Sequence, residues 1–261
     1  MMSYDIIGNI AIMKFTDGTP LSERKSSAEK ILAKHKNITT VLAKASDVQG
    51  RLRTIKTRHL AGIKTTEAVY KENGCTFFLD VNTCYFSPRL SEERKRLVAE
   101  CKRGERVMVM FGGVAPYAIT IAKGKPSVKE VVSVEIGREC SKYAARNVIK
   151  NKVEGKVQII QGDVKKQIPK LTGAGVVFDR IIMARPNLEE TFIKTALRVA
   201  KKGTIIHYHG FAHENEREKM VKDLEEETKR EERRVKILSV MRVGDIAPGK
   251  YRYRVNLKIL N

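Results

Sequence analysis

The sequence predicts an α/β fold, with a small α+β domain over residues 1–84 followed by a doubly wound, Rossmann-like domain over residues 85–261. The central observation is the stretch VMVMFGGVAPYAITIA at 107–122, which indicates a buried strand, a glycine turn and the start of a helix. After it, apolar strand-like runs alternate with helix-like runs, a pattern typical of a parallel sheet covered on both faces. The N-terminal part has strand signals around a single helix, which predicts a separate α+β unit.

In the N-terminal part, runs rich in Ile and Val predict strands, and a helix-forming segment follows Ser22 as its cap. The pair Asn73-Gly74 is common in tight turns and predicts a hairpin. The expected elements are strand 4–15, helix 22–34, strand 39–43 and the two hairpin strands 67–72 and 76–81. A basic segment, residues 51–58, separates the second predicted strand, 39–43, from the hairpin.

In the C-terminal part, Ser87 and Pro88 followed by acidic residues predict the start of a helix that ends near Gly104. Beyond it we expect strands 107–111, 130–135, 157–160, 178–183 and 203–208, and helices from about 116, at 138–151, 188–200 and 214–234. Two final strands, 236–242 and 251–259, are expected to pair antiparallel at the edge of the sheet.

The composition favours a polyanionic partner. The chain has 51 Lys and Arg against 30 Asp and Glu, a formal net charge of +21. Nucleic acid is the first expectation, because neutralising phosphates releases counterions, and an acidic membrane surface is the weaker one. A Lys-rich proteome would also produce such a charge. The four scattered cysteines indicate a reducing compartment, and no leader or membrane span is evident, so we expect a cytoplasmic protein.

Polar groups follow three of the predicted parallel strands. The turn at Gly112-Gly113 would let a cofactor approach the backbone, and Glu135 ends the next strand, where it could accept hydrogen bonds from ribose hydroxyls. Gly162-Asp163 follows the third strand and could bind an adenine amino group. The turn is neither GxGxxG nor a phosphate loop, so this set fits S-adenosyl-L-methionine better than a dinucleotide. Ordinary tight turns with solvated acids are the alternative.

Several longer stretches match one known family. They are YDIIGNIAI, KHKNITTVLAK, RLRTIKTRHLAG, YKENGCTFFLDV, YFSPRLSEER, MFGGVAPYAI, IIMARP and GTIIHYH. With them the chain resembles, over nearly its whole length, the archaeal and eukaryotic tRNA (guanine-N1)-methyltransferases, which modify the guanosine on the 3′ side of the anticodon. The resemblance implies a Rossmann-like methyltransferase domain, S-adenosyl-L-methionine as cofactor, and the tRNA anticodon stem-loop as partner. We also expect a monomer.

The resemblance implies roles for individual residues. Glu93 matches the general base that takes the guanine N1 proton, and Arg53 matches the arginine that steadies guanine O6; without the resemblance, Glu93 and Arg94 would be an ordinary charged helix surface. The expected cofactor-binding residues are Arg94, Phe111, Gly113, Glu135, Ile136, Asp163, Val164, Ala184 and Pro186. The expected RNA-binding residues are Arg51, Arg53, Arg58, Arg89 and Arg185.

The chain also departs from the family pattern. Val109 replaces a usual acid, Ala115 replaces the second glycine of the turn, and Ala184 replaces an asparagine that helps to hold cofactor and base. Arg185 could supply a substitute donor. We expect the chain to lack the extra N-terminal domain of many archaeal members, so the basic charge would carry more of the RNA binding. His207 and His209 lack a carboxylate or cysteine cluster, so no metal site is expected.

These departures keep two alternatives open. One is an enzyme of the wyosine pathway that transfers a methyl or aminocarboxypropyl group to a tricyclic guanosine derivative in tRNA. The other is a tRNA-binding protein that has kept the fold and lost catalysis.

Overall fold

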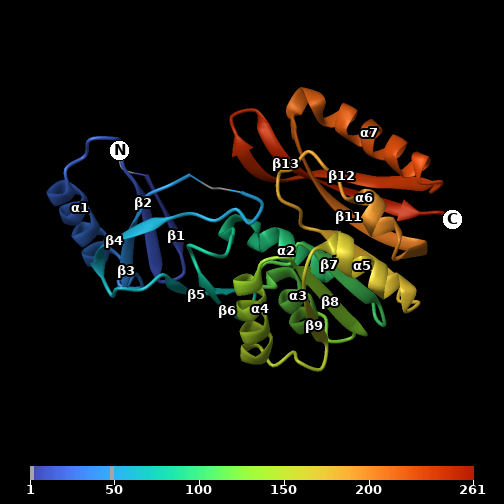
Figure 1. Cartoon of the computed structure of the whole chain (residues 1–261), viewed down its shortest axis with the longest axis horizontal. Helices are drawn as coiled ribbons and strands as arrows, with labels where there is room; N and C mark the ends of the chain where they lie inside the picture. The colour runs from blue at the N-terminus through green and yellow to red at the C-terminus, as the bar shows by residue number, and fades with distance from the viewer. Residues whose placement is uncertain (1–2, 48–49) are drawn as a thin grey trace.

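The computed structural model describes residues 3–47 and 50–261. The molecule is elongated, with a small four-stranded sheet at one end and a seven-stranded sheet at the other (Figure 1). The small sheet has the order β1-β2-β3-β4 and is covered by one helix. Its elements are β1 (Ser3–Ile7), β2 (Ile10–Lys14), α1 (Leu21–Lys34), β3 (Thr40–Lys44) and β4 (Thr57–Gly62).

The predicted single strand 4–15 is a hairpin. It turns at Gly8, whose φ is 57°, and a Cβ there would lie 2.0 Å from the carbonyl oxygen of Val69. Only glycine fits this approach. The strand β4 was not predicted, because its sequence TRHLAG carries a basic pattern with few apolar residues.

The predicted hairpin is confirmed as β5 (Glu67–Glu72) and β6 (Cys75–Asp80), with both Asn73 and Gly74 at positive φ. It packs against α4 (Arg138–Lys150), where the Asn147 side chain exchanges hydrogen bonds of 2.8 and 3.0 Å with the backbone of Phe78. The hairpin is a separate two-stranded sheet that packs against a helix of the larger α/β unit. The division of the chain at residue 84 stays a prediction.

The larger sheet confirms the predicted α/β class. Its order is β12-β13-β11-β10-β7-β8-β9, and β7 to β11 are parallel, whereas β13 runs antiparallel between β11 and β12. The strands are β7 (Arg106–Met110), β8 (Glu130–Glu135), β9 (Val157–Gln161), β10 (Phe178–Met183), β11 (Ala200–His213), β12 (Val235–Ala247) and β13 (Lys250–Ile259).

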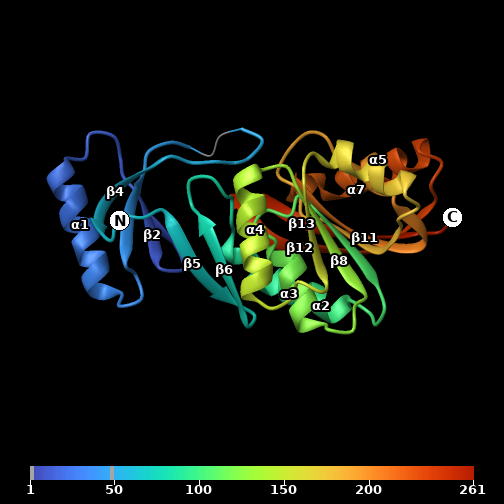
Figure 2. The ribbon, with the colours of Figure 1, turned by 60° about the horizontal axis from the view of Figure 1, so that its bottom comes forward.

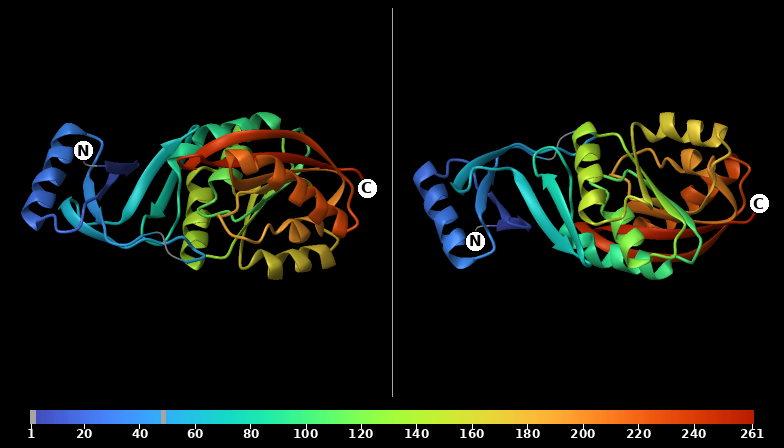
Figure 3. Two further views of the ribbon diagram at one scale, coloured as in Figure 1. Left: turned by 90° about the horizontal axis from the view of Figure 1, so that it is seen from above. Right: turned by 90° about the horizontal axis from the view of Figure 1, so that it is seen from below.

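Helices cover both faces of this sheet, and Figures 2 and 3 show them on opposite sides. One face bears α2 (Ser91–Glu100), α3 (Pro116–Gly124) and α4; the other bears α5 (Val164–Gly173), α6 (Ile193–Leu197) and α7 (Arg217–Arg230). Alternate residues of β7 enter the two cores, Val107 and Val109 on the first face, Met108 and Met110 on the second. This period of two is what a strand buried on both faces requires.

Two helices of the C-terminal part also differ from the prediction. The helix α5 was not predicted; Asp163 caps it by accepting a hydrogen bond from the Lys165 N–H at 2.9 Å, and it continues through Pro169. The expected helix 188–200 is only the short α6, because Phe192 before it has a left-handed φ of 61° and β11 already begins at Ala200. None of the helices within 3–47 and 50–261 has the length and apolar character needed to cross a bilayer.

Candidate active site

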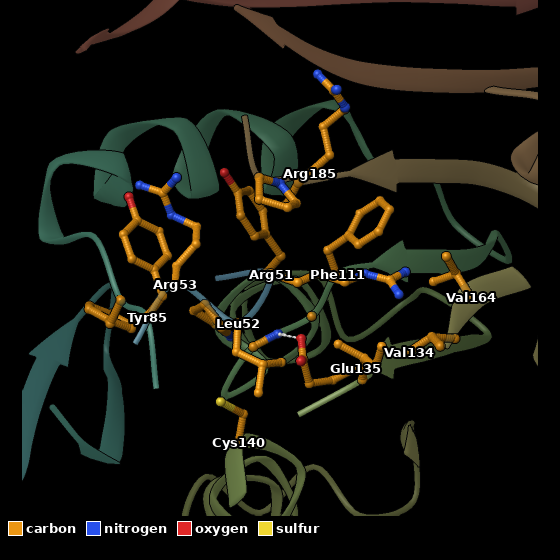
Figure 4. Close-up of a pocket in the computed structure, with 18 of the residues that line it drawn as sticks. Arg51, Leu52, Arg53, Tyr85, Phe111, Val134, Glu135, Cys140, Val164 and Arg185 are labelled. Carbon is orange, nitrogen blue, oxygen red and sulfur yellow. Dashed lines mark hydrogen bonds between the residues drawn. The ribbon is translucent and has the colours of Figure 1, made fainter. Parts of the chain in front are cut away.

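A pocket of about 980 Å³, its open mouth included, lies at the carboxyl ends of the central strands (Figure 4). From β7 the chain proceeds to β8 and β9 on one side and then returns to β10 and β11 on the other. Such a reversal point is where open α/β sheets bind ligands. Its walls come from the turns after β7 to β10, from 51–53 and from residues near α2.

The turn after β7 has the predicted close-packed form. A Cβ on Gly112 would lie 2.1 Å from the Ser133 hydroxyl oxygen, so a side chain does not fit there. Phe111, Gly113 and Ala115 have φ values of 63°, 56° and 64°. Ala115 therefore adopts the left-handed conformation in place of the family's glycine, at a cost of about 1–2 kcal/mol.

Glu135 at the end of β8 is held by backbone donors. Its two carboxylate oxygens accept from the Gly113 N–H at 2.8 Å and the Gly137 N–H at 2.6 Å. Burial raises the pKa of this carboxyl, against these hydrogen bonds, which lower it. The two backbone donors therefore fix the carboxylate before any ligand binds, and both of its oxygens keep lone pairs that a ligand can use.

Asp163 lies at the start of α5 on the same side of the pocket. Its Oδ1 caps the helix, and its Oδ2 forms an ion pair of 3.0 Å with the Arg51 guanidinium. This pair brings the predicted basic segment across the pocket to the end of β9. Ile136 and Val164 also line this side of the pocket and add apolar surface, and their role in cofactor binding stays a prediction.

The turn after β10 places Ala184, Arg185 and Pro186 in the pocket lining. Ala184 has no polar group to offer. The Arg185 side chain is 3% exposed and donates to the carbonyl oxygens of Leu188 and, at 2.7 Å, of Glu190. Burial lowers the pKa of Arg185. Figure 4 shows its side chain extending away from Glu135, and both of these hydrogen bonds come from Nη2 and serve its own loop.

Arg53 and Tyr85 form another wall. The Arg53 guanidinium lies 4.5 Å from the centroid of the Tyr85 ring, and Figure 4 shows the two side chains side by side. The Arg53 Nε is buried without a hydrogen-bond partner among the described residues. A free, desolvated donor beside an aromatic ring suits a planar ligand with an acceptor atom.

Arg94 also lines the pocket, but its charge is already paired. It donates to both carboxylate oxygens of Glu72, at 2.6 Å for one of them, and to the Ser87 carbonyl oxygen at 3.1 Å. The side chains of the pair are only 2% and 3% exposed.

Glu93 lies behind the pocket rather than in its lining. Its Oε1 forms an ion pair of 3.0 Å with Arg254 and lies 3.2 Å from His209 Nε2. Its Oε2 has no hydrogen-bond partner within the described parts of the chain. Burial lowers the pKa of His209, which is therefore the neutral donor to Glu93.

Sequence reasoning missed Arg254 and the partnership of His209 with Glu93. The pairing of β11 with β13 brings these residues together, since His207, His209 and Phe211 of β11 stand opposite Asn256, Arg254 and Arg252 of β13. The sequence predicted only 236–242 as a partner of the last strand, and the predicted strand 203–208 ends before His209. His207 is neutral, since burial lowers its pKa; it accepts from Arg180 and donates to Asn256, each at 2.6 Å. In residues 3–47 and 50–261 no three His, Cys, Asp or Glu side chains are placed to hold a metal ion.

The other predicted RNA-binding arginines lie outside the pocket. Arg89 is 75% exposed at its side chain and pairs with Asp5 at 3.0 Å, in a groove between β1–β2 and the tip of the β12–β13 hairpin. This groove shares Arg53, Tyr85 and Arg252 with the pocket, so the two are continuous. Arg58 is exposed on β4 and lines neither.

The pocket residues fit a nucleoside-bearing cofactor without a phosphate. Glu135 is a fixed acceptor for hydroxyl groups, and the Gly113 N–H that a phosphate would take is used by Glu135 itself. Phe111, Ile136 and Val164 add apolar walls for a base. The fold and this site together define a Rossmann-like methyltransferase domain.

The family follows from comparison with known proteins. The family model described as the TRM5/TYW2 methyltransferase domain matches residues 68–238, and one described as the TYW2 N-terminal domain matches residues 1–65. The chain therefore belongs to the TRM5/TYW2 methyltransferase family.

Two curated relatives illustrate the range of this family. The chain is 37% identical over 214 residues to the tRNA (guanine(37)-N(1))-methyltransferase Trm5b of Pyrococcus abyssi, covering 82% of this chain and 61% of that protein. It is 34% identical to the tRNA (guanine(37)-N(1))/4-demethylwyosine(37)-methyltransferase Taw22 of Nanoarchaeum equitans, covering 99% of this chain and all of the relative, 100%. The chain thus spans less than two thirds of the first relative and the whole of the second.

Solved structures agree with the fold. The crystal structure of Pyrococcus abyssi Trm5b has a TM-score of 0.85 at 33% identity, covering 99% of this chain and 75% of that one. That of Methanocaldococcus jannaschii Trm5 in complex with adenosine has a TM-score of 0.81 at 27% identity, covering 99% and 74%.

Proposed function

We propose that this protein is a tRNA methyltransferase that transfers a methyl group from S-adenosyl-L-methionine to N1 of the guanosine at position 37, 3′ of the anticodon. One observation carries the proposal: the pocket, whose residues fit a nucleoside, is continuous with the basic groove through Arg53 and Arg252. A base could enter the pocket while the flanking strand stays in the groove. The names of the two curated relatives support the same reaction.

The cofactor half of the pocket would hold the adenosine of S-adenosyl-L-methionine, whose sulfonium supplies an electrophilic methyl group. Glu135 accepts hydrogen bonds from the ribose hydroxyls, and its geometry is set in advance by the Gly113 and Gly137 N–H groups. Asp163 accepts from the adenine amino group once Arg51 moves from its carboxylate.

The base half of the pocket would hold the flipped-out guanine, at an unstacking cost of a few kcal/mol. Arg53 donates from Nε to the guanine oxygen and so stabilises the charge that develops as N1 loses its proton. Glu93 takes that proton on Oε2, its unpartnered oxygen among the described residues. The base and this carboxylate must approach each other on binding, as catalytic pairs often do.

A second candidate is methyl transfer to a tricyclic guanosine derivative of the wyosine pathway. It is favoured by the match to a relative named for both reactions over 99% of this chain. The small side chain of Ala184 at the pocket wall leaves room for an additional ring.

We also propose that residues 1–84 act as the RNA-binding part of the protein. Their exposed cations include Arg58 on β4, and Lys14 and Lys44 lie at the groove. Binding to tRNA should therefore weaken steeply as salt is raised.

The test is incubation of the protein with labelled S-adenosyl-L-methionine and tRNA transcripts that carry G or A immediately 3′ of the anticodon. We expect label in 1-methylguanosine with the G transcript alone, identified by nucleoside mass. Label only in tRNA that carries 4-demethylwyosine would support the second candidate. Binding of tRNA without transfer to either substrate would mean that the protein has lost catalysis.

A further inference from the structure

The hydroxyl group of Tyr117 is a buried donor in the pocket wall. Tyr117 is 3% exposed, lies in the first turn of α3 and contributes to the pocket lining. Its hydroxyl has no hydrogen-bond partner within residues 3–47 and 50–261. Leaving a buried hydroxyl unpaired costs about 1–3 kcal/mol, and a ligand that accepts a hydrogen bond from this hydroxyl would remove that cost.

The ring of Tyr117 is held in place from two directions. The His209 ring contacts it edge-on, with 5.9 Å between the ring centroids. The Arg94 guanidinium lies 5.7 Å from its centroid, and that guanidinium is itself fixed by Glu72. The hydroxyl therefore has a defined position before a ligand arrives.

The charged groups that face this hydroxyl place it on the base half of the pocket. They are Arg94, Glu93, Arg252 and Arg254, which come from α2 and β13. The acids of the cofactor half, Glu135 and Asp163, lie at the ends of β8 and β9 on the other side of β7. Burial raises the pKa of Tyr117, so its hydroxyl stays protonated and can donate at neutral pH.

Three neighbours on this half, Ala184, Arg185 and Arg94, are less free to donate to a ligand. Ala184 has no polar side-chain atom, and Arg185 gives two hydrogen bonds to its own loop. Arg94 is committed to Glu72 and Ser87. Tyr117 and the Nε of Arg53 thus remain as buried, unpartnered donors of the pocket wall among the described residues, beside the Nε of Arg185.

We propose that the Tyr117 hydroxyl donates a hydrogen bond to the exocyclic carbonyl oxygen of the target base and acts as a catalytic residue. This inference rests on the proposed function. When Glu93 takes the N1 proton, the electrons of the N1–H bond stay on the base, and the ring shares the negative charge with that oxygen. N1 then bonds to the methyl carbon as the carbon–sulfur bond breaks and its electron pair returns to sulfur, which leaves neutral S-adenosylhomocysteine. A donor that is already in place strengthens its bond as this charge grows, so it accelerates transfer more than it tightens binding.

The experiment compares wild type with Tyr117→Phe in single-turnover methyl transfer to the G transcript. The substitution removes one oxygen and keeps the ring. We expect a rate lower by about tenfold or more, as for the loss of one oxyanion donor. The dissociation constants for tRNA and S-adenosylhomocysteine and the melting temperature should be nearly unchanged. Tyr143→Phe is the matched control, because its hydroxyl donates to Glu67 at 3.0 Å away from the pocket.

A second substrate identifies the acceptor. With 6-thioguanosine at the target position, the acceptor atom is sulfur, which accepts hydrogen bonds only weakly. Methyl transfer by wild type should therefore be slower on this transcript than on the G transcript. The rate of Tyr117→Phe on this transcript should be only slightly below that of wild type, because the hydrogen bond is already weak. An unchanged rate for Tyr117→Phe on the G transcript would overturn the inference, as would an equal loss on both transcripts. If wild type does not methylate the G transcript at all, the proposed function fails first and the inference falls with it.

Discussion

The two halves of the pocket hold their acidic residues by different means. Glu135, on the cofactor half, accepts hydrogen bonds from the backbone N–H groups of Gly113 and Gly137. Glu93, behind the base half, is held by the side chains of Arg254 and His209. One carboxylate is thus fixed by two tight turns, and the other by an ion pair with Arg254 of β13 and a hydrogen bond from His209 of β11.

The difference teaches that the two halves depend on the fold to different degrees. Glu135 and its partners are 2 and 22 residues apart in sequence, so one β-α-β unit holds this carboxylate. Glu93 is 116 residues from His209 and 161 from Arg254. The base half is complete only when the last strand has joined the sheet.

The strongest way to break this comparison is to remove the cation from Glu93. Arg254→Met should lower the free energy of unfolding by about 3–5 kcal/mol, because it leaves a buried carboxylate unpaired. Urea denaturation measures this. Arg230→Met removes an exposed ion pair with Glu226 and should have almost no effect. Equal losses of unfolding free energy in the two variants would mean that the buried ion pair stabilises the fold no more than the exposed one.

Glu93→Gln tests the chemistry of the same half. We expect methyl transfer to slow by about a hundredfold, because an amide cannot take the N1 proton. Affinities for S-adenosylhomocysteine and tRNA should hold. Glu92→Gln, on the exposed side of the same helix turn, should retain wild-type rates. Wild-type turnover by Glu93→Gln would remove this residue from the mechanism.

Glu135→Gln tests the cofactor half and should weaken S-adenosylhomocysteine binding by about tenfold, since a charged acceptor is lost. Isothermal titration calorimetry measures the change, with the exposed Glu139→Gln as its control. Stability should change much less than in Arg254→Met. If instead the protein unfolds, the backbone donors of this half would depend on the carboxylate.

The pH dependence of binding follows from the same carboxyl group. Burial raises the pKa of Glu135 above its usual 4.5, and only the ionised form accepts two hydroxyl donors. Affinity for S-adenosylhomocysteine should therefore start to fall, as pH is lowered, at a pH above 4.5. In the ligand-free protein the sign is opposite, because this group's contribution to stability is full below that value and lost as pH rises through the raised pKa. Glu135→Gln should remove both effects.

The smallest effect is expected at the edge of the cofactor half. Arg51→Ala frees Asp163 from a partly exposed ion pair of 3.0 Å and should tighten S-adenosylhomocysteine binding by less than about fivefold. Arg58→Ala, which lines neither pocket nor groove, should leave it unchanged. Weaker binding by Arg51→Ala would mean that Arg51 itself contacts the cofactor.

The sequence predicted those strands, turns and helices that short sequence patterns determine. The strand, turn and helix around Gly112, the hairpin at Asn73-Gly74 and the antiparallel edge strands are all confirmed. It did not predict α5, whose start depends on the Asp163 cap and which contains a proline. The sequence did not predict that His209 and Arg254 hold Glu93, for another reason. These two residues come together through the pairing of β11 with β13, and the sequence of one strand does not show which strand pairs with it.

Asn147 of α4 and Asn151, which directly follows this helix, have a consequence for the behaviour of the protein in a crowded cell. A two-stranded ribbon has open edges, which are places where another polypeptide can add a strand and start aggregation. Along β6, Asn147 and Asn151 occupy the N–H and carbonyl groups of Phe78 and Thr76 through their side-chain amides. A helix thereby blocks the edge that a foreign strand would use, and replacing both asparagines with alanine should make the protein more prone to self-association.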